Sequence, residues 1–127
     1  ILNPGDEVIV PIPYWVSYPE LIKLADGVPV FVEGKEENDY KYTLESLNKV
    51  VNDNTKAIII NSPNNPTGTV YSIDELKEIA EFAQKHDLII ISDEIYEKLI
   101  YDGKKHVSVA SLSEDLLQAS QRLRKKL

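Results

Sequence analysis

The chain has 127 residues, of which 43% are hydrophobic and 28% charged, a composition typical of one globular domain and not of a disordered or fibrous protein. Its formal net charge of −7 argues against a nucleic-acid-binding surface, and its longest apolar runs are far shorter than the ~20 residues that span a bilayer. The absence of cysteine excludes a disulfide framework and thiolate metal ligands, so we expect a soluble protein of the cytoplasm.

The first part of the chain alternates between a strand pattern and a helix pattern. A β-branched run predicts a strand at residues 7–12, although Pro11 is unfavourable in a central strand because it has no N–H to donate. Apolar residues at steps of three and four in "WVSYPELIKLADG" then predict a helix that Gly27 ends. The segment "VPVFVE", residues 28–33, is the next predicted strand.

The same alternation continues through the second part. "TLESLNKVV" has the apolar spacing of a short helix begun by Thr43, and "TKAIII" is the third predicted strand. Ser72 and Glu75 have the spacing of a capping box at the start of the best helix pattern, "YSIDELKEIAEFAQKH". The apolar run in "DLIIISDEIY" predicts a fourth strand with both faces covered by helices.

Alternating strands and helices indicate an α/β fold with three layers, in which a mainly parallel sheet has helices on both faces. Ligands of such sheets bind outside the carboxyl ends of the strands. Three short segments occupy those ends here: "PYW" after the first strand, "NSPNNPTG" after the third and "SDEIY" after the fourth. We therefore expect these segments to meet at one edge of the sheet.

Four side chains in these segments could carry chemistry, and each also has a simpler structural interpretation. Asp93 ends an apolar strand, where a buried carboxylate needs a cationic or hydrogen-bonding partner, but it could also be a loop or capping residue. Tyr96 could direct a hydroxyl to the same edge or fill the core. Asn65 could present its amide to a ligand or serve the turn. Trp15 could stack on a planar ligand or fill the core.

In their order and approximate spacing, "NPGDEVIVPIPYWVSYPE", "NSPNNPTGTVY" and "ISDEIYEKLIYDG" resemble the class I aminotransferases, pyridoxal-phosphate enzymes with the aspartate aminotransferase fold. The resemblance covers residues 1–116 and is strongest to bacterial aspartate aminotransferases. It implies part of the large, cofactor-binding domain of an enzyme that transfers an amino group between L-aspartate and 2-oxoglutarate. Such a protein takes amino-acid and 2-oxo-acid substrates, forms homo-oligomers and has no nucleic-acid or membrane partner.

The resemblance also implies roles for the four side chains. Trp15 would stack on the pyridine ring of pyridoxal 5'-phosphate and contact the substrate. Asn65 would bond the 3' oxygen of the cofactor and the substrate carboxylate, and Tyr96 would bond the same oxygen. Asp93 would pair with the protonated pyridine nitrogen, because a positively charged ring is the better electron sink. The Asn- and Pro-rich turn would then be stiff in order to hold Asn65 still.

Several parts of the family pattern are missing from the chain. No Ser-x-Ser-Lys motif supplies the Schiff-base lysine, and Lys104 and Lys105, in a hairpin-like loop, are poor substitutes. The Ser/Gly-rich phosphate loop and the distal arginine for the substrate are absent too. We therefore expect no catalytic residue, weak or absent cofactor binding, and no transamination by this chain alone.

Residues 117–127 depart from the family pattern. Leu116, Ser120, Leu123 and Leu127 stand at helical steps and predict a helical tail, which truncation, a frameshift or an engineered end could each explain. Two alternatives to the aminotransferase hypothesis stay open. The chain could be a non-enzymatic α/β scaffold, or part of another enzyme of the same fold, such as a carbon–sulfur lyase or an aminocyclopropane-carboxylate synthase.

Overall fold

The computed structural model describes residues 1–112, so the predicted tail of residues 117–127 lies outside the described part. None of the described helices is long and apolar enough to cross a membrane. The elements, in chain order, are β1 (Glu7–Ile12), α1 (Ser17–Leu24), β2 (Val28–Glu33), η1 (Glu36–Asn38), α2 (Leu44–Val50), β3 (Thr55–Asn61), α3 (Ile73–Lys85), β4 (Ile89–Asp93) and η2 (Val109–Ser111).

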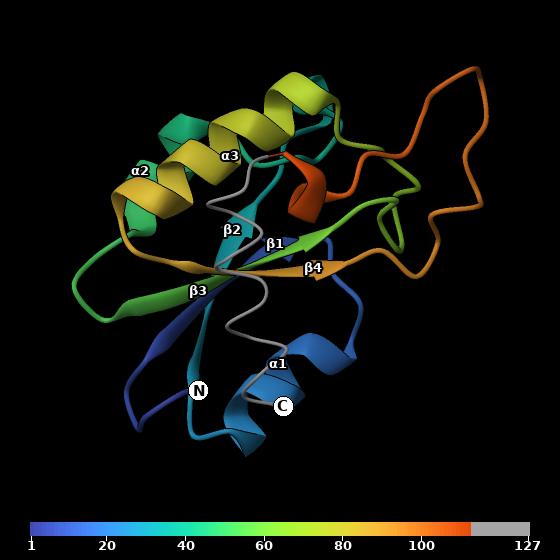
Figure 1. Cartoon of the computed structure of the whole chain (residues 1–127). Coiled ribbons are helices and arrows are strands. Elements are labelled where there is room, and N and C mark those ends of the chain that lie inside the picture. The colour runs from blue at the N-terminus through green and yellow to red at the C-terminus, as the bar shows by residue number, and fades with distance from the viewer. Residues whose placement is uncertain (113–127) are drawn as a thin grey trace.

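The four strands form one parallel sheet in the order β2-β1-β3-β4. Helix α1 covers one face of this sheet, and α2 and α3 cover the other (Figure 1). The predicted three-layer α/β fold is therefore confirmed. Because all strands run in the same direction, their carboxyl ends lie along one edge, from which the loops after β1, β3 and β4 emerge.

Pro11 is tolerated in β1, which is an inner strand of the sheet. The register of β1 with β2 continues from Glu7 to Ile12, but the register with β3 stops at Ile9. Pro11 therefore lies where β1 has a partner on one side only, and its missing N–H breaks no ladder with β3.

Local signals in the sequence account for the helix ends. Thr43 and Ser46 form a complete capping box at the start of α2, and Ser72 and Glu75 form another at the start of α3. Each box satisfies backbone N–H groups that the first turn leaves without partners.

Helix α1 ends at Leu24, before Gly27, the residue that was predicted to end it. Asp26, not Gly27, adopts the left-handed conformation, with φ of 61°. The Gly27 N–H then donates to the Ile22 carbonyl at 2.9 Å. A Cβ on Gly27 would lie 2.7 Å from the end of the Leu2 side chain and 3.2 Å from the Ile22 carbonyl oxygen, so the glycine allows close packing here.

The sheet separates two hydrophobic clusters. The larger one, between the sheet and the α2 and α3 side, includes Ile58, Ile60, Leu47, Leu76 and Phe82. The smaller one, on the α1 side, consists of Val8, Val10, Tyr18, Ile22, Ala57 and Ile59. Alternate residues of β1 and β3 thus enter opposite clusters, as the twofold period of a strand requires.

Two buried tyrosines carry polar groups inside the larger cluster. The Tyr42 hydroxyl donates to the Ile59 carbonyl at 2.8 Å, and the Tyr71 hydroxyl accepts from the Tyr42 backbone N–H at 2.9 Å. Burial raises the pKa of both phenols well above its ordinary value. These bonds satisfy polar groups that would be costly to bury alone.

The fourth strand is covered less fully than expected. Ile90 packs against the larger cluster and Ile89 against the smaller one. Within residues 1–112, however, strand β4 pairs only with β3, so it is the edge strand of the described sheet. Ile89 and Ile90 are only partly buried, and Ile91 is 36% exposed. The prediction of a strand was correct, but an apolar run alone does not fix the place of that strand in the sheet.

Candidate functional site

The carboxyl edge of the sheet holds all four predicted site residues. Trp15 follows β1, Asn65 lies in the loop after β3, Asp93 is the last residue of β4, and Tyr96 lies in the turn that follows. Trp15 is 44% exposed, while Asn65, Asp93 and Tyr96 are half-buried. Trp15 and Tyr96 are therefore not core residues, and their side chains are open to a ligand.

Asp93 has the hydrogen-bonding partners that its position predicts. The Tyr18 hydroxyl donates to its Oδ2 at 2.6 Å, and the Ile95 backbone N–H donates to its Oδ1 at 3.2 Å. Both donors are neutral, and no cationic side chain of residues 1–112 forms an ion pair with the Asp93 carboxylate.

Tyr18 is a site residue that the sequence analysis assigned only to the apolar spacing of a helix. It lies on α1, buried, and its ring meets that of Trp15 edge to face, with centroids 5.7 Å apart and an interplanar angle of 82°. Burial and then the hydrogen bond to Asp93 raise the pKa of Tyr18. Tyr18 therefore keeps its proton and donates a hydrogen bond to the Asp93 carboxylate.

Asn61, at the end of β3, connects the loop to β4. Its side chain is 2% exposed, and its amide donates to the carbonyls of Asp93 at 3.0 Å and Pro63 at 3.2 Å. Its Oδ1 accepts from the Asn65 backbone N–H at 2.8 Å. The sequence contained a signal for Asn61, because a polar residue ends the apolar run "AIII". Asp93 was selected as a candidate for the same reason, since it ends the next apolar strand.

The loop after β3 is stabilised by its own polar side chains. Asn64 Oδ1 accepts from the Thr67 hydroxyl at 2.9 Å, and the Asn64 and Thr69 main chains are joined at 2.9 Å. Gly68 permits the tight return with φ of 72°. Asn65 therefore lies in a turn, as the simpler structural interpretation predicted. Its side chain makes none of the bonds within this turn and instead approaches Tyr96, with Nδ2 3.4 Å from the Tyr96 Oη.

Together these groups present an indole, a fixed carboxylate, an amide and a phenol at one open edge. A planar heterocycle with a basic ring nitrogen and an anionic oxygen on its ring matches this set, since the carboxylate pairs with the protonated nitrogen and the two donors share the oxygen. Lys104 and Lys105 are exposed and make no side-chain hydrogen bond or ion pair with any residue of 1–112. Neither lysine therefore has a hydrogen bond or an ion pair with the four site residues.

The fold and the candidate site define an α/β domain with a parallel sheet, whose carboxyl edge is where ligands of such sheets bind. The chain belongs to the aminotransferase class I and II family, whose sequence profile matches residues 1–121. Pyridoxal phosphate is the typical cofactor of this family.

Similar proteins include the aspartate aminotransferases of Bacillus sp. (strain YM-2) and Bacillus subtilis (strain 168). Each is 59% identical over 116 residues, which are 91% of this chain and 30% of the relative. An aromatic aminotransferase from Pyrococcus horikoshii OT3 has a similar structure, with a TM-score of 0.88 and 49% identity over 90% of this chain and 31% of its own. The chain thus spans about a third of the length of these relatives.

Proposed function

We propose that the chain forms the central part of the cofactor-binding domain of a pyridoxal-phosphate-dependent aminotransferase that transfers an amino group between L-aspartate and 2-oxoglutarate. The relatives named aspartate aminotransferase, at 59% identity, support this substrate pair. The observation that carries the proposal is the arrangement of Trp15, Asn65, Asp93 and Tyr96 at one edge of the sheet.

Each of these side chains has a role that follows from its chemistry. Asp93 would pair with the protonated ring nitrogen, and Asn65 and Tyr96 would donate to the ring oxygen. Trp15 would stack on the ring and limit the access of water to it. When bound, the cofactor supplies an electron sink for the electrons released at the substrate's α-carbon.

Tyr18 and Asn61 act as positioning residues for Asp93. Tyr18 fixes the rotamer of the carboxylate through the 2.6 Å bond to Oδ2. Asn61 fixes the backbone of Asp93 and of Asn65 at once, because it bonds both. A carboxylate held in one geometry pairs with the ring nitrogen without first losing side-chain entropy.

The same reasoning limits what the chain does alone. No lysine of residues 1–112 makes a hydrogen bond or ion pair with the four site residues. The chain also lacks the Ser-x-Ser-Lys motif whose lysine would hold the cofactor and move the proton at the substrate's α-carbon, a contribution of about 10² to 10⁴ in rate. It also has no phosphate loop, whose helix-terminal amides would add anion contacts. The chain by itself therefore binds the cofactor ring weakly and does not catalyse transamination.

Fluorescence tests the ring site directly, because Trp15 is the only tryptophan of the chain. Pyridoxal phosphate stacked on the indole quenches its emission in a saturable titration. Asp93→Ala and Asn65→Ala weaken this titration about tenfold each, whereas Asn48→Ala, an exposed asparagine on α2, leaves it unchanged. Equal quenching in all variants would favour the scaffold interpretation.

A second assay tests the expected inactivity. Aspartate, 2-oxoglutarate and pyridoxal phosphate are incubated with the chain, oxaloacetate is followed, and borohydride is added to trap any covalent lysine adduct. We expect no turnover and no single stoichiometric adduct. Robust turnover with one adduct at Lys104 or Lys105 would contradict the proposal that the catalytic lysine is absent.

A further inference from the structure

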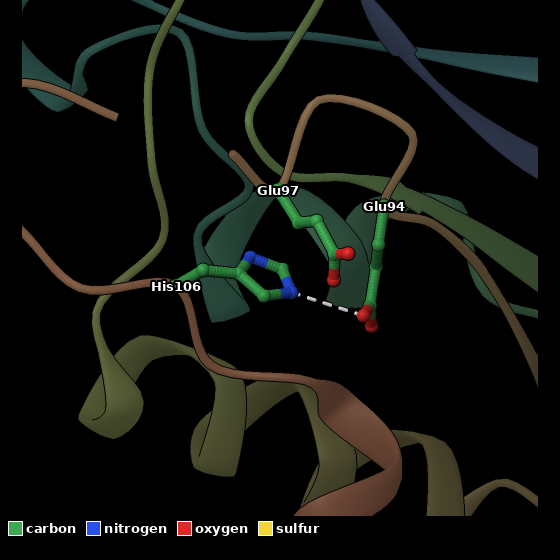
Figure 2. Close-up of side chains that lie close together, drawn as sticks. All are labelled: Glu94, Glu97 and His106. Carbon is green, nitrogen blue, oxygen red and sulfur yellow. Dashed lines mark hydrogen bonds and ion pairs between the residues drawn. The ribbon is translucent and has the colours of Figure 1, made fainter. Parts of the chain in front are cut away.

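Glu94, Glu97 and His106 form a second polar cluster close to the candidate cofactor edge (Figure 2). Glu94 and Glu97 lie in the turn after β4, and His106 comes from the segment that returns toward η2. One ligand atom from each side chain lies within 4.8 Å of the other two, and His106 Nε2 is 3.0 Å from Glu94 Oε2. In Figure 2 the imidazole and the Glu97 carboxylate both point toward the Glu94 carboxylate.

The surroundings of the cluster fix Glu94 in one orientation. Its side chain is 22% exposed, and its Oε1 accepts from the Ser92 hydroxyl at 2.8 Å, the Ser108 hydroxyl at 3.1 Å and the Val109 backbone N–H at 3.3 Å. Oε2 is left facing His106. Hydrogen bonds of this kind to the distal oxygen orient carboxylates that bind metal ions.

One ring nitrogen of His106 has no hydrogen-bond partner among the described residues. Its side chain is 14% exposed, and its Nδ1 is buried with no hydrogen-bond partner among the described residues. If Nε2 carries the proton, a buried Nδ1 lone pair is left unpaired. If Nδ1 alone carries the proton, the Nε2 lone pair faces the Glu94 carboxylate at 3.0 Å, a repulsion that either a second proton on the ring or a bound cation would remove.

The charge of the cluster is also unbalanced. The Glu97 side chain makes no hydrogen bond or ion pair with any residue of 1–112. Two carboxylates therefore converge on one imidazole, and one bound cation would balance them.

We propose that Glu94, Glu97 and His106 bind one divalent cation of the Zn²⁺ class. One imidazole nitrogen and two carboxylate oxygens suit a borderline ion such as Zn²⁺, for which three protein ligands and a water are a common set. The ion takes the Nε2 lone pair, and Nδ1 then carries the proton. The site joins the end of β4 to the segment before η2, and it does not depend on the proposed aminotransferase function.

Calorimetry of the whole chain with ZnCl₂, in a buffer that does not chelate zinc, tests the site. We expect one equivalent to bind. Glu97→Gln weakens binding by about tenfold or more, because it removes a ligand that is exposed and has no other contact. Glu78→Gln, an exposed glutamate on α3, is the matched control and leaves binding unchanged. Circular dichroism verifies that both variants keep the fold.

The two histidines supply a second, independent readout. Zinc shifts the ring resonances of His106 and leaves those of His86, at the C-terminal end of α3, in place. His106→Gln abolishes the stoichiometric binding, and His86→Gln does not. No binding by the unaltered chain, equal binding by Glu97→Gln, or a shift of both histidines alike would overturn the proposal and leave the cluster as a hydrogen-bonded loop anchor.

Discussion

Strands β3 and β4 have nearly the same apolar pattern but different surroundings. Ile59 of β3 and Ile91 of β4 are paired in register and face the same side of the sheet as α1. Ile59 is buried at 4% exposure, whereas Ile91 is 36% exposed. The cause is topology, because β3 lies between two strands and β4 lies at the edge. Hydrophobicity therefore predicts a strand, while its neighbours decide how much each side chain stabilises the fold.

The strongest test of this comparison is to truncate both isoleucines. Ile59→Ala removes buried methyl groups and leaves a cavity, so we expect it to lower the free energy of unfolding by about 2 to 5 kcal/mol. Ile91→Ala should cost less than about half of that, because water already reaches its side chain. Urea denaturation of both variants gives the two values, and similar losses would contradict the difference in burial.

The next test concerns the bond that fixes the end of β4. Tyr18→Phe removes the hydroxyl that donates to Asp93 and leaves a half-buried carboxylate short of a donor. A bond to a charged group of this kind is worth about 1.5 to 3 kcal/mol. Tyr14→Phe is the control, since the Tyr14 ring stacks on Phe31 and its hydroxyl makes no bond with a described residue. Equal stability of the two variants would show that the Tyr18 bond contributes little.

The exposed edge of β4 also predicts association. An apolar edge strand invites pairing with another chain, so we expect the chain to be non-monomeric at tens of micromolar. Ile91→Lys should raise the dissociation constant at least about tenfold, or ~1.4 kcal/mol. Ile73→Lys, at an exposed isoleucine on α3, should not. Sedimentation velocity measures both, and a monomeric unaltered chain would contradict the prediction.

The smallest effect is expected on the well-covered side of the sheet. Burial opposes ionisation of Glu75, but its bonds to the Ser72 backbone and to Lys41 outweigh this and lower its pKa from 4.5. A lowered pKa means that Glu75 adds stability above its unfolded pKa and loses it as the pH falls. Glu75→Gln should therefore be less stable than the original chain at pH 7, by under about 1 kcal/mol, and the gap should close below pH 4.5. A gap that persists at pH 3 would assign the effect to packing.

Sequence patterns predicted the elements well because each pattern reports a local cause. The capping residues Thr43 and Ser72 determine where α2 and α3 begin, and the β-branched runs determine the strands. The partial exposure of β4 was not predicted, because the burial of a strand depends on which strands and helices lie beside it. No local signal in "LIII" distinguishes an inner strand from an edge strand.

Part of the candidate site was also predicted from the sequence, and part of it was not. The rule on carboxyl ends placed Trp15, Asn65, Asp93 and Tyr96 at one edge of the sheet, because each of them ends a strand or lies within four residues of a strand end. Tyr18 was missed, since its partner is 75 residues away and its helical spacing gave a sufficient explanation. The contacts of His106 arise from a loop without periodicity, so only the fold brings it to Glu94.

The two buried tyrosines of the larger cluster allow alkaline unfolding of the protein to be followed by phenolate absorbance. Tyr42 and Tyr71 resist ionisation inside the fold, whereas an unfolded chain would ionise them near pH 10. Folding is therefore favoured by these phenols below pH 10 and loses their contribution as the pH rises above it. The phenolate absorbance of this pair should then appear with the loss of the fold, in one cooperative step that needs no added dye.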